Sequence, residues 1–207
     1  MAESVRQAGI RATAWGVRFT IRRLARFAAV SGALLGCGGA GSSAPTTPPC
    51  DDVCMDDVAI TGFRETLKLA FNLTLQGKPV GFQDATAACP LGGSVHISGT
   101  ATSNADQGTT EVNLTYVLDA CAYSQIDTDP TESYSLTVTG TAIEMGTLSA
   151  QPSSTTALTI DSSSMTLSGT VYSPALTYQA TGCAITLGQN GNDLAGTLCG
   201  RTVGATL

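Results

Sequence analysis

An alternation of apolar and polar residues with a period of two recurs along this chain from residue 57 onward. Its first example is the segment 66–76, TLKLAFNLTLQ, which has an apolar residue at every odd-numbered position. The side chains of a strand point alternately to its two faces, so this spacing is typical of a strand with one buried face. We therefore predict a strand over residues 66–76, whose inward side chains would be Leu67, Leu69, Phe71, Leu73 and Leu75.

The same alternation occurs in three segments in the middle of the chain, 94–101, 110–120 and 133–145. The residues expected on the buried face are Val95, Ile97, Val112, Leu114, Tyr116, Leu118, Tyr134, Leu136 and Val138. In the third segment the apolar positions change from even to odd numbers after Gly140, where Ile143 and Met145 follow. We predict a β-bulge or bend at Gly140, because one extra residue exchanges the two faces of a strand.

Four more alternating segments fill the C-terminal third, namely TALTI (156–160), SMTLSGTVY (164–172), LTYQATGCAITL (176–187) and DLAGTLCG (193–200). Turn-rich sequences such as DSSS and QNGND separate them, and Asn-Gly between two alternating runs is a strong hairpin signal. No window shows the 3.6-residue period of an amphipathic helix. The pattern predicts an all-β fold, an antiparallel meander of about eight to ten strands closed as a barrel or folded as a sandwich.

A different pattern marks the N-terminus. Arg22, Arg23 and Arg26 precede FAAVSGALLG, a run of ten uncharged residues that ends directly before Cys37. A helix that spans a bilayer needs about 20 apolar residues, so this run is too short to be a resident membrane helix. A basic flank followed by a short apolar run is typical of a secretory signal peptide.

Leu34-Leu35-Gly36-Cys37 resembles the lipobox of bacterial lipoproteins, in which a small residue precedes the cysteine. The resemblance implies that the Cys37 thiol receives a diacylglycerol, that the chain is cut before Cys37, and that the new N-terminus is acylated. Residues 1–36 would then be a signal peptide, and the protein would be anchored by lipid in a bacterial cell envelope. Gly38, rather than Asp, favours the outer membrane, while the side of that membrane stays open.

The segment that follows Cys37, GGAGSSAPTTPP, contains only small residues, Thr and Pro. Such a composition cannot form a core and is typical of a linker. The sequence therefore predicts a lipidated cysteine and tether over residues 37–49 and one disulfide-bonded all-β domain over residues 50–207.

The balance of basic and acidic residues changes after residue 36. Beyond residue 36 the chain has four Lys and Arg residues against fifteen Asp and Glu residues. So acidic a domain cannot neutralise a phosphate backbone, which excludes nucleic acid as a partner. Anionic lipid would also repel it, so we expect membrane attachment through the Cys37 lipid and not through a basic patch.

Six cysteines remain when Cys37 is set aside, and no CxxC pair occurs among them. An even number of cysteines in an exported domain indicates disulfides. Six cysteines allow fifteen connectivities. In a meander, segments that follow one another in sequence lie side by side, which favours the pairs Cys50–Cys54, Cys89–Cys121 and Cys183–Cys199. For the last pair, a three-residue loop at 190–192 would place the two cysteines opposite each other, whereas a two-residue Asn-Gly turn would match the apolar faces better. We predict a bulge near this turn that satisfies both.

Candidate chemistry is sparse. His96 is the only histidine, it alternates with apolar residues on the polar face of its segment, and no GxSxG, P-loop or HExxH motif occurs. The acidic segments CDDVCMDD (50–57) and DTDP (127–130) do not have the spacing of an EF-hand. We therefore predict no catalytic residue, no cofactor and no metal ligand.

Two function classes remain open. One is a non-catalytic, lipid-anchored envelope or surface module with a protein partner that the sequence does not specify. The other is a lipocalin-like barrel that binds an apolar small molecule or lipid. The volume inside the sheet distinguishes these classes, and the inward residues expected here are of mixed size.

Overall fold

The computed structural model describes residues 49–104, 106–149 and 155–207. The predicted signal peptide, Cys37 and all of the tether except Pro49 lie outside the described residues. The helices are α1 (Asp52–Leu75) and the short 3-10 helix η1 (Pro130–Glu132). The strands are β1 (Gly81–Ala88), β2 (Ser94–Asn104), β3 (Thr109–Gln125), β4 (Tyr134–Ser149), β5 (Ala157–Val171), β6 (Leu176–Asn190), β7 (Asp193–Leu198) and β8 (Arg201–Thr206).

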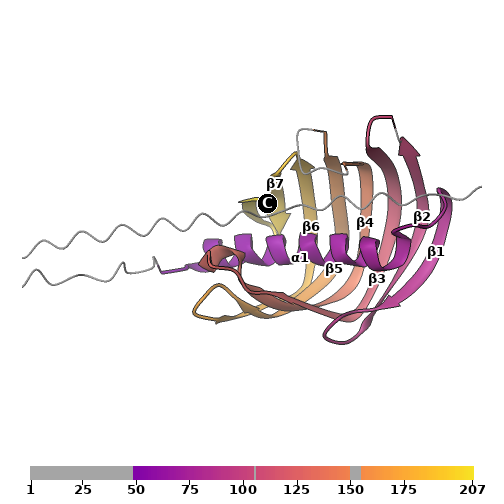
Figure 1. Cartoon of the computed structure of the whole chain (residues 1–207). Helices are drawn as coiled ribbons and strands as arrows, with labels where there is room; N and C mark the ends of the chain where they lie inside the picture. Colours follow the sequence, from indigo (N-terminus) through magenta and orange to yellow (C-terminus); the bar gives the residue numbers. More distant parts are fainter. Residues whose placement is uncertain (1–48, 105, 150–154) are drawn as a thin grey trace, which may run out of the picture. The chain divides into compact units, whose positions relative to one another are not determined.

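The eight strands form one antiparallel sheet in which each strand pairs with its neighbours in sequence, in the order β1 to β8. The predicted all-β antiparallel meander is therefore confirmed. Figure 1 shows the sheet curving around α1, which lies across the strands on their inner face. The helix contacts all eight strands. No helix in the described part of the chain combines the length and apolar character needed to cross a membrane.

The strand predicted over residues 66–76 is wrong, because these residues form the second half of α1. The helix begins after Asp51, whose side chain accepts a hydrogen bond of 3.0 Å from the Cys54 N–H and so caps the first turn. Its most buried apolar side chains recur every three or four residues, as in Ile60, Phe63, Leu67 and Ala70. The sheet encloses α1 from several sides, so apolar residues lie on more than one face of the helix. The sequence therefore does not show the single apolar stripe, with a period of 3.6 residues, that identifies a half-buried helix.

The core lies between α1 and the inner face of the sheet. All nine residues expected on the buried face between residues 94 and 138 lie there. The largest fully buried side chains are Tyr116, Phe63, Ile60, Leu67, Ile97, Leu114, Leu118, Leu136, Ile160, Met165, Leu167 and Ile185. Gly62 lets the helix approach the sheet closely, since a Cβ atom there would stand 2.7 Å from Leu136 Cδ1. The helix therefore fills the space that the curved sheet encloses.

The bulge predicted at Gly140 lies on the neighbouring strand: the pairing of β4 with β5 shifts between Gly140 and Ile143, but Gly140 pairs with Met165 and Ile143 with Asp161, so the extra residue is in β5. Gly140 has a φ of +139°, which L side chains rarely adopt. However, the expected inward direction of Ile143 and Met145 is wrong. These side chains are 41% and 42% exposed, while Glu144 between them is 1% exposed on the inner face. β4 keeps its even-numbered residues inward on both sides of Gly140.

The segment DSSS, expected to be a turn, lies inside β5, which runs unbroken from Ala157 to Val171 with a register shift between Ser162 and Met165. The bulge therefore takes the place of a turn here. The hairpin at QNGND is confirmed, with Asn190 paired to Asp193 across a loop of two residues.

The three predicted disulfides, Cys50–Cys54, Cys89–Cys121 and Cys183–Cys199, are all present. The bulge expected near the turn at 190 is wrong, because β6 and β7 pair without a register shift and place Leu198 opposite Ile185. Cys199 instead lies in the turn between β7 and β8, where it and Gly200 have φ values of +53° and +77°. This turn takes Cys199 out of the alternation of the strand, and its side chain can therefore bond with Cys183.

Candidate functional site

Two groups of side chains, each an arginine, a carboxylate and a tyrosine, join α1 to the sheet. The first, here called the N-terminal triad, consists of Asp56 on α1, Tyr178 on β6 and Arg201 on β8. The Tyr178 hydroxyl donates a hydrogen bond of 2.7 Å to Asp56 Oδ1. Arg201 donates from Nη2 to Oδ1 at 2.8 Å and from Nε to Oδ2 at 2.6 Å. Both carboxylate oxygens of this buried aspartate are therefore hydrogen-bonded.

The protonation states of the N-terminal triad follow from these contacts. Burial raises the pKa of Tyr178, and its hydrogen bond to Asp56 raises that pKa further. The hydrogen bonds to Asp56 likewise raise the pKa of Arg201. At neutral pH the tyrosine and the arginine are thus both protonated donors to the carboxylate.

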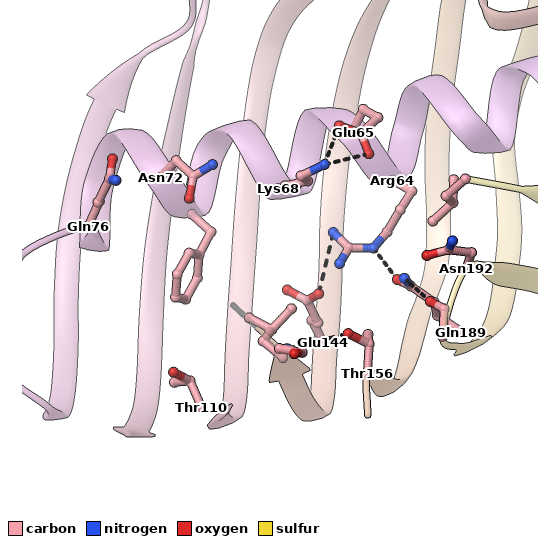
Figure 2. A pocket seen from close by; sticks show the side chains of 15 residues that line it. Arg64, Glu65, Lys68, Asn72, Gln76, Thr110, Glu144, Thr156, Gln189 and Asn192 are labelled. Atoms are coloured by element: carbon pink, nitrogen blue, oxygen red, sulfur yellow. Dashed lines mark hydrogen bonds and ion pairs between the residues drawn. The ribbon is translucent and has the colours of Figure 1, made fainter. Parts of the chain in front are cut away.

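The second group, here called the pocket triad, consists of Arg64 on α1, Tyr116 on β3 and Glu144 on β4. Arg64 and Glu144 are only 4% and 1% exposed. The Tyr116 hydroxyl donates a hydrogen bond of 2.5 Å to Glu144 Oε2. Arg64 donates from Nε to Gln189 Oε1 at 2.6 Å, while its Nη1 stays 3.8 Å from Glu144 Oε1. Figure 2 shows the Arg64 side chain extending from the helix to both partners.

One oxygen of the pocket triad has an unmet hydrogen bond. A separation of 3.8 Å is too long for a hydrogen bond, and Glu144 Oε1 has no hydrogen-bond partner among the described residues. Burial raises the pKa of Tyr116 well above its usual value, and the charge of Glu144 adds to this effect, so the tyrosine stays a donor to Oε2. A buried acceptor without a donor costs about 1–3 kcal/mol, and more when it is charged.

The pocket triad borders a cavity of about 510 Å³. The cavity lies between α1 and one end of the sheet, where β3 begins and where β4 and β6 end. The helix contributes Arg64, Glu65, Lys68, Phe71, Asn72 and Gln76. The sheet and its connections contribute Thr110, Glu144, Leu148, Ser149, Thr156, Gln189, Gly191, Asn192 and Leu207. The volume lies within the range of small-molecule binding sites, roughly 300–1,000 Å³.

The charges around this cavity balance. Arg64 faces Glu144, and Lys68 Nζ lies 3.1 Å from Glu65 Oε2 in an ion pair one helical turn further along α1. Figure 2 shows Lys68, Asn72 and Gln76 following one another along the helix above the strand ends. The cavity wall therefore carries two positive and two negative side chains beside its amides and hydroxyls.

None of the candidate site residues singled out from the sequence lines this cavity, although Phe71, expected to be an inward strand residue, does. Cys37 lies outside the described residues, and the six bonded cysteines are elsewhere. His96 stands on the outer face of β2, where its Nε2 lies 2.8 Å from Asp84 Oδ1 on β1, with both side chains partly exposed. This position confirms the expected histidine on the polar face of a strand.

The acidic segment 50–57 has structural roles. Asp51 caps α1, Asp56 belongs to the N-terminal triad, and Asp57 Oδ1 accepts a hydrogen bond of 2.9 Å from the Gly204 N–H. Within residues 49–104, 106–149 and 155–207, no cluster of three or more His, Cys, Asp or Glu side chains could hold a metal ion.

The segment DTDP leads into η1, with Asp129 as its N-cap and Pro130 as its first residue. Asp127 accepts a hydrogen bond from the Asp129 N–H, which lowers the pKa of its carboxyl. Asp129 accepts hydrogen bonds from the hydroxyl and N–H of Thr131, which lower its pKa as well. These contacts are ordinary turn chemistry.

Arg64 and Glu144 were not predicted as site residues from the sequence. Both had a signal: Arg64 is one of four cations beyond residue 36, and Glu144 interrupts an apolar stretch between Ile143 and Met145. A charged residue within or beside an apolar segment is informative, because it must be paired when it is buried.

Comparison with known proteins gives no match to any family model, to any curated protein or to any solved structure.

Proposed function

We propose that this chain is a lipid-anchored, non-catalytic module of a bacterial cell envelope that binds a small molecule in the cavity beside the pocket triad. The observation that carries the binding function is the buried, unpaired Oε1 of Glu144 at the wall of a cavity of about 510 Å³. An unmet acceptor at this depth is explained if a ligand supplies the donor.

The anchor rests on the sequence. The lipobox-like Leu34-Leu35-Gly36-Cys37 follows a basic flank and a short apolar run. Three disulfides in the domain suit an oxidising compartment such as the periplasm or the cell surface. We infer attachment to the outer membrane through acyl chains on Cys37, because two or three chains anchor a protein stably whereas one does not.

The non-catalytic role is inferred from the groups around the cavity. Among the described residues that line it, none is a histidine or a cysteine. Tyr116 and Glu144 are bonded to each other, and the elevated pKa of the tyrosine makes it a poor proton donor to a substrate at neutral pH. These features favour binding over acid-base chemistry.

A second candidate is a carrier of an apolar small molecule or lipid. Phe71, Leu148 and Leu207 supply apolar surface to the cavity and favour this alternative. However, α1 occupies the space inside the sheet that a lipocalin-like carrier would use, and its Ile60, Phe63 and Leu67 are fully buried there.

Replacement of Cys37 by Ser tests the anchor. Cells are labelled with radioactive palmitate and fractionated, and the tether variant Ser42→Ala serves as the control. We expect Cys37→Ser to lose the label and to leave the membrane fraction, while Ser42→Ala keeps both. Label and membrane retention unchanged by Cys37→Ser would contradict the anchor.

Native mass spectrometry of the detergent-extracted protein tests the binding function. We expect a small molecule to accompany the wild-type chain and to be lost from Glu144→Gln. A ligand-free wild-type chain that also binds no added compound would contradict it.

A further inference from the structure

We propose that the cavity beside the pocket triad binds a neutral, hydroxyl-rich molecule of the size of a mono- or disaccharide. This inference rests on the proposed binding function and names the chemical class of its ligand. It starts from the two polar groups that meet at the cavity wall, the guanidinium of Arg64 and the carboxylate of Glu144.

Glu144 and Arg64 both have unused hydrogen-bonding capacity at the cavity wall. Glu144 Oε1 lacks a donor, and the Nη atoms of Arg64 donate no hydrogen bond to any described residue. A ligand group that lies between them must therefore donate to the carboxylate and accept from the guanidinium. A hydroxyl group does both at once.

Charged and purely apolar ligand groups do not fit the position between Glu144 and Arg64. A ligand carboxylate or phosphate cannot donate to Glu144 and would be repelled by it. An ammonium group would donate to Glu144 but could not accept from Arg64, and both Arg64 and Lys68 would repel it. A hydrocarbon would leave the oxygen of Glu144 without a donor. With two positive and two negative side chains at the wall, the cavity suits a neutral ligand.

The rest of the cavity lining also offers polar groups. The side chains of Asn72, Gln76, Thr110 and Asn192 line the cavity and make no hydrogen bond to other described residues. Amides and hydroxyls, like the hydroxyls of a sugar, both donate and accept, so they can bind several adjacent ligand hydroxyls. Phe71 adds an aromatic ring against which the C–H face of a sugar ring can pack. The polar and apolar parts of the lining thus fit the two kinds of surface on a sugar.

The experiment titrates the full-length, detergent-solubilised chain with three sets of probes. The neutral sugars are glucose, galactose, N-acetylglucosamine and maltose. The charged analogues are glucuronate and glucosamine, and the apolar probe is N-phenyl-1-naphthylamine. Binding is measured by calorimetry and by saturation-transfer NMR at millimolar sugar concentrations. We expect at least one neutral sugar to bind about ten-fold more tightly than its charged analogues, because only the neutral form leaves no charge unpaired.

Variants assign the binding to the cavity. Glu144→Gln removes the charged acceptor, and we expect it to weaken sugar binding about ten-fold or more. Because a change at a buried residue can disturb folding, the exposed cavity residue Asn72 provides a second variant, and Asn72→Ala should weaken binding several-fold with the fold unchanged. Asn113→Ala, exposed on the outer face of β3, is the matched control and should leave binding unchanged.

The outcomes distinguish this inference from the proposed function. Sugar binding that Glu144→Gln and Asn72→Ala weaken and Asn113→Ala does not would support the proposal. Binding of N-phenyl-1-naphthylamine alone, weakened by the same two variants, would overturn the sugar class and leave the binding function standing. No binding of any sugar would also overturn the sugar class, and no binding of any probe would contradict the binding function as well.

Discussion

The N-terminal triad and the pocket triad use the same three kinds of side chain to join α1 to the sheet, but they differ in their hydrogen bonds. In the N-terminal triad both oxygens of Asp56 accept hydrogen bonds of 2.6–2.8 Å from Arg201 and Tyr178. In the pocket triad the Tyr116 hydroxyl donates a hydrogen bond to Oε2 of Glu144. The other oxygen, Oε1, has no donor among the described residues, and Nη1 of Arg64 lies 3.8 Å from it.

We propose that this difference separates a structural contact from a binding contact. This chain can satisfy a buried carboxylate completely, as it does at Asp56. The carboxylate of Glu144, which lacks a donor for one of its oxygens, lies beside a cavity, and Arg64 faces the same cavity. A buried polar group that is left unsatisfied destabilises the folded state, so the proposed ligand would stabilise the fold by donating to Glu144 Oε1.

The largest expected effect is the loss of stability in Asp56→Asn. The substitution removes the charge on which three hydrogen bonds converge, each worth roughly 1.5–3 kcal/mol as a bond to a charged group. We expect the free energy of unfolding to fall by about 3 kcal/mol in urea denaturation at neutral pH. Asp52→Asn, exposed in the first turn of α1, is the control and should change it by less than about 0.5 kcal/mol. A loss at Asp56 no larger than at Asp52 would show that the N-terminal triad is not a structural contact.

A smaller effect is expected at alkaline pH, where the tyrosines of both triads resist ionisation. Burial raises the pKa of Tyr116 and Tyr178 in the folded chain, whereas in the unfolded chain they ionise near 10.0. Their contribution to stability is therefore complete below pH 10 and is lost as the pH rises from there through the raised values of the folded state.

Tyr116→Phe isolates this effect in the pocket triad. The wild-type free energy of unfolding should fall above about pH 10 by up to 1.4 kcal/mol per pH unit more steeply than that of the variant, because one proton-releasing group is missing from the variant's unfolded state. Urea denaturation at a series of pH values measures both slopes, with tyrosinate absorbance as the probe of ionisation. Equal slopes would mean that Tyr116 ionises in the folded chain.

Much of the sheet could be predicted from the sequence, because a half-buried strand has a period of two that is visible in short segments. Val95, Leu114 and Leu136 were placed inward for this reason, and they are buried. The disulfides followed from the order of strands in a meander. What these features share is that each depends on local spacing or on neighbours along the chain.

The candidate site could not be predicted, because it depends on two exceptions to these patterns. Residues 66–76 alternate like a strand but belong to a helix that the sheet encloses, so the helix that carries Arg64 was missed. Ile143 and Met145 suggested that the faces of β4 exchange after Gly140, which would direct Glu144 outward. The exposure of two apolar side chains and the burial of the glutamate between them depend on Arg64 and Tyr116, which are distant in the sequence.

The most direct test of the comparison replaces each triad by apolar residues of similar size. The pocket variant is Arg64→Met with Tyr116→Phe, Glu144→Leu and Gln189→Leu, where the last change is needed because Arg64 also donates to Gln189 Oε1. The N-terminal variant is Asp56→Leu with Tyr178→Phe and Arg201→Met. In both triads the carboxylate is buried, and replacing it and its partners by apolar side chains removes the desolvation penalty of that carboxylate, but only the pocket triad also loses an unmet hydrogen bond. We predict that the pocket variant has the larger free energy of unfolding of the two, by about 1–3 kcal/mol, in urea denaturation without added ligand. Equal values, or a more stable N-terminal variant, would contradict the claim that the pocket triad is kept incomplete for a ligand.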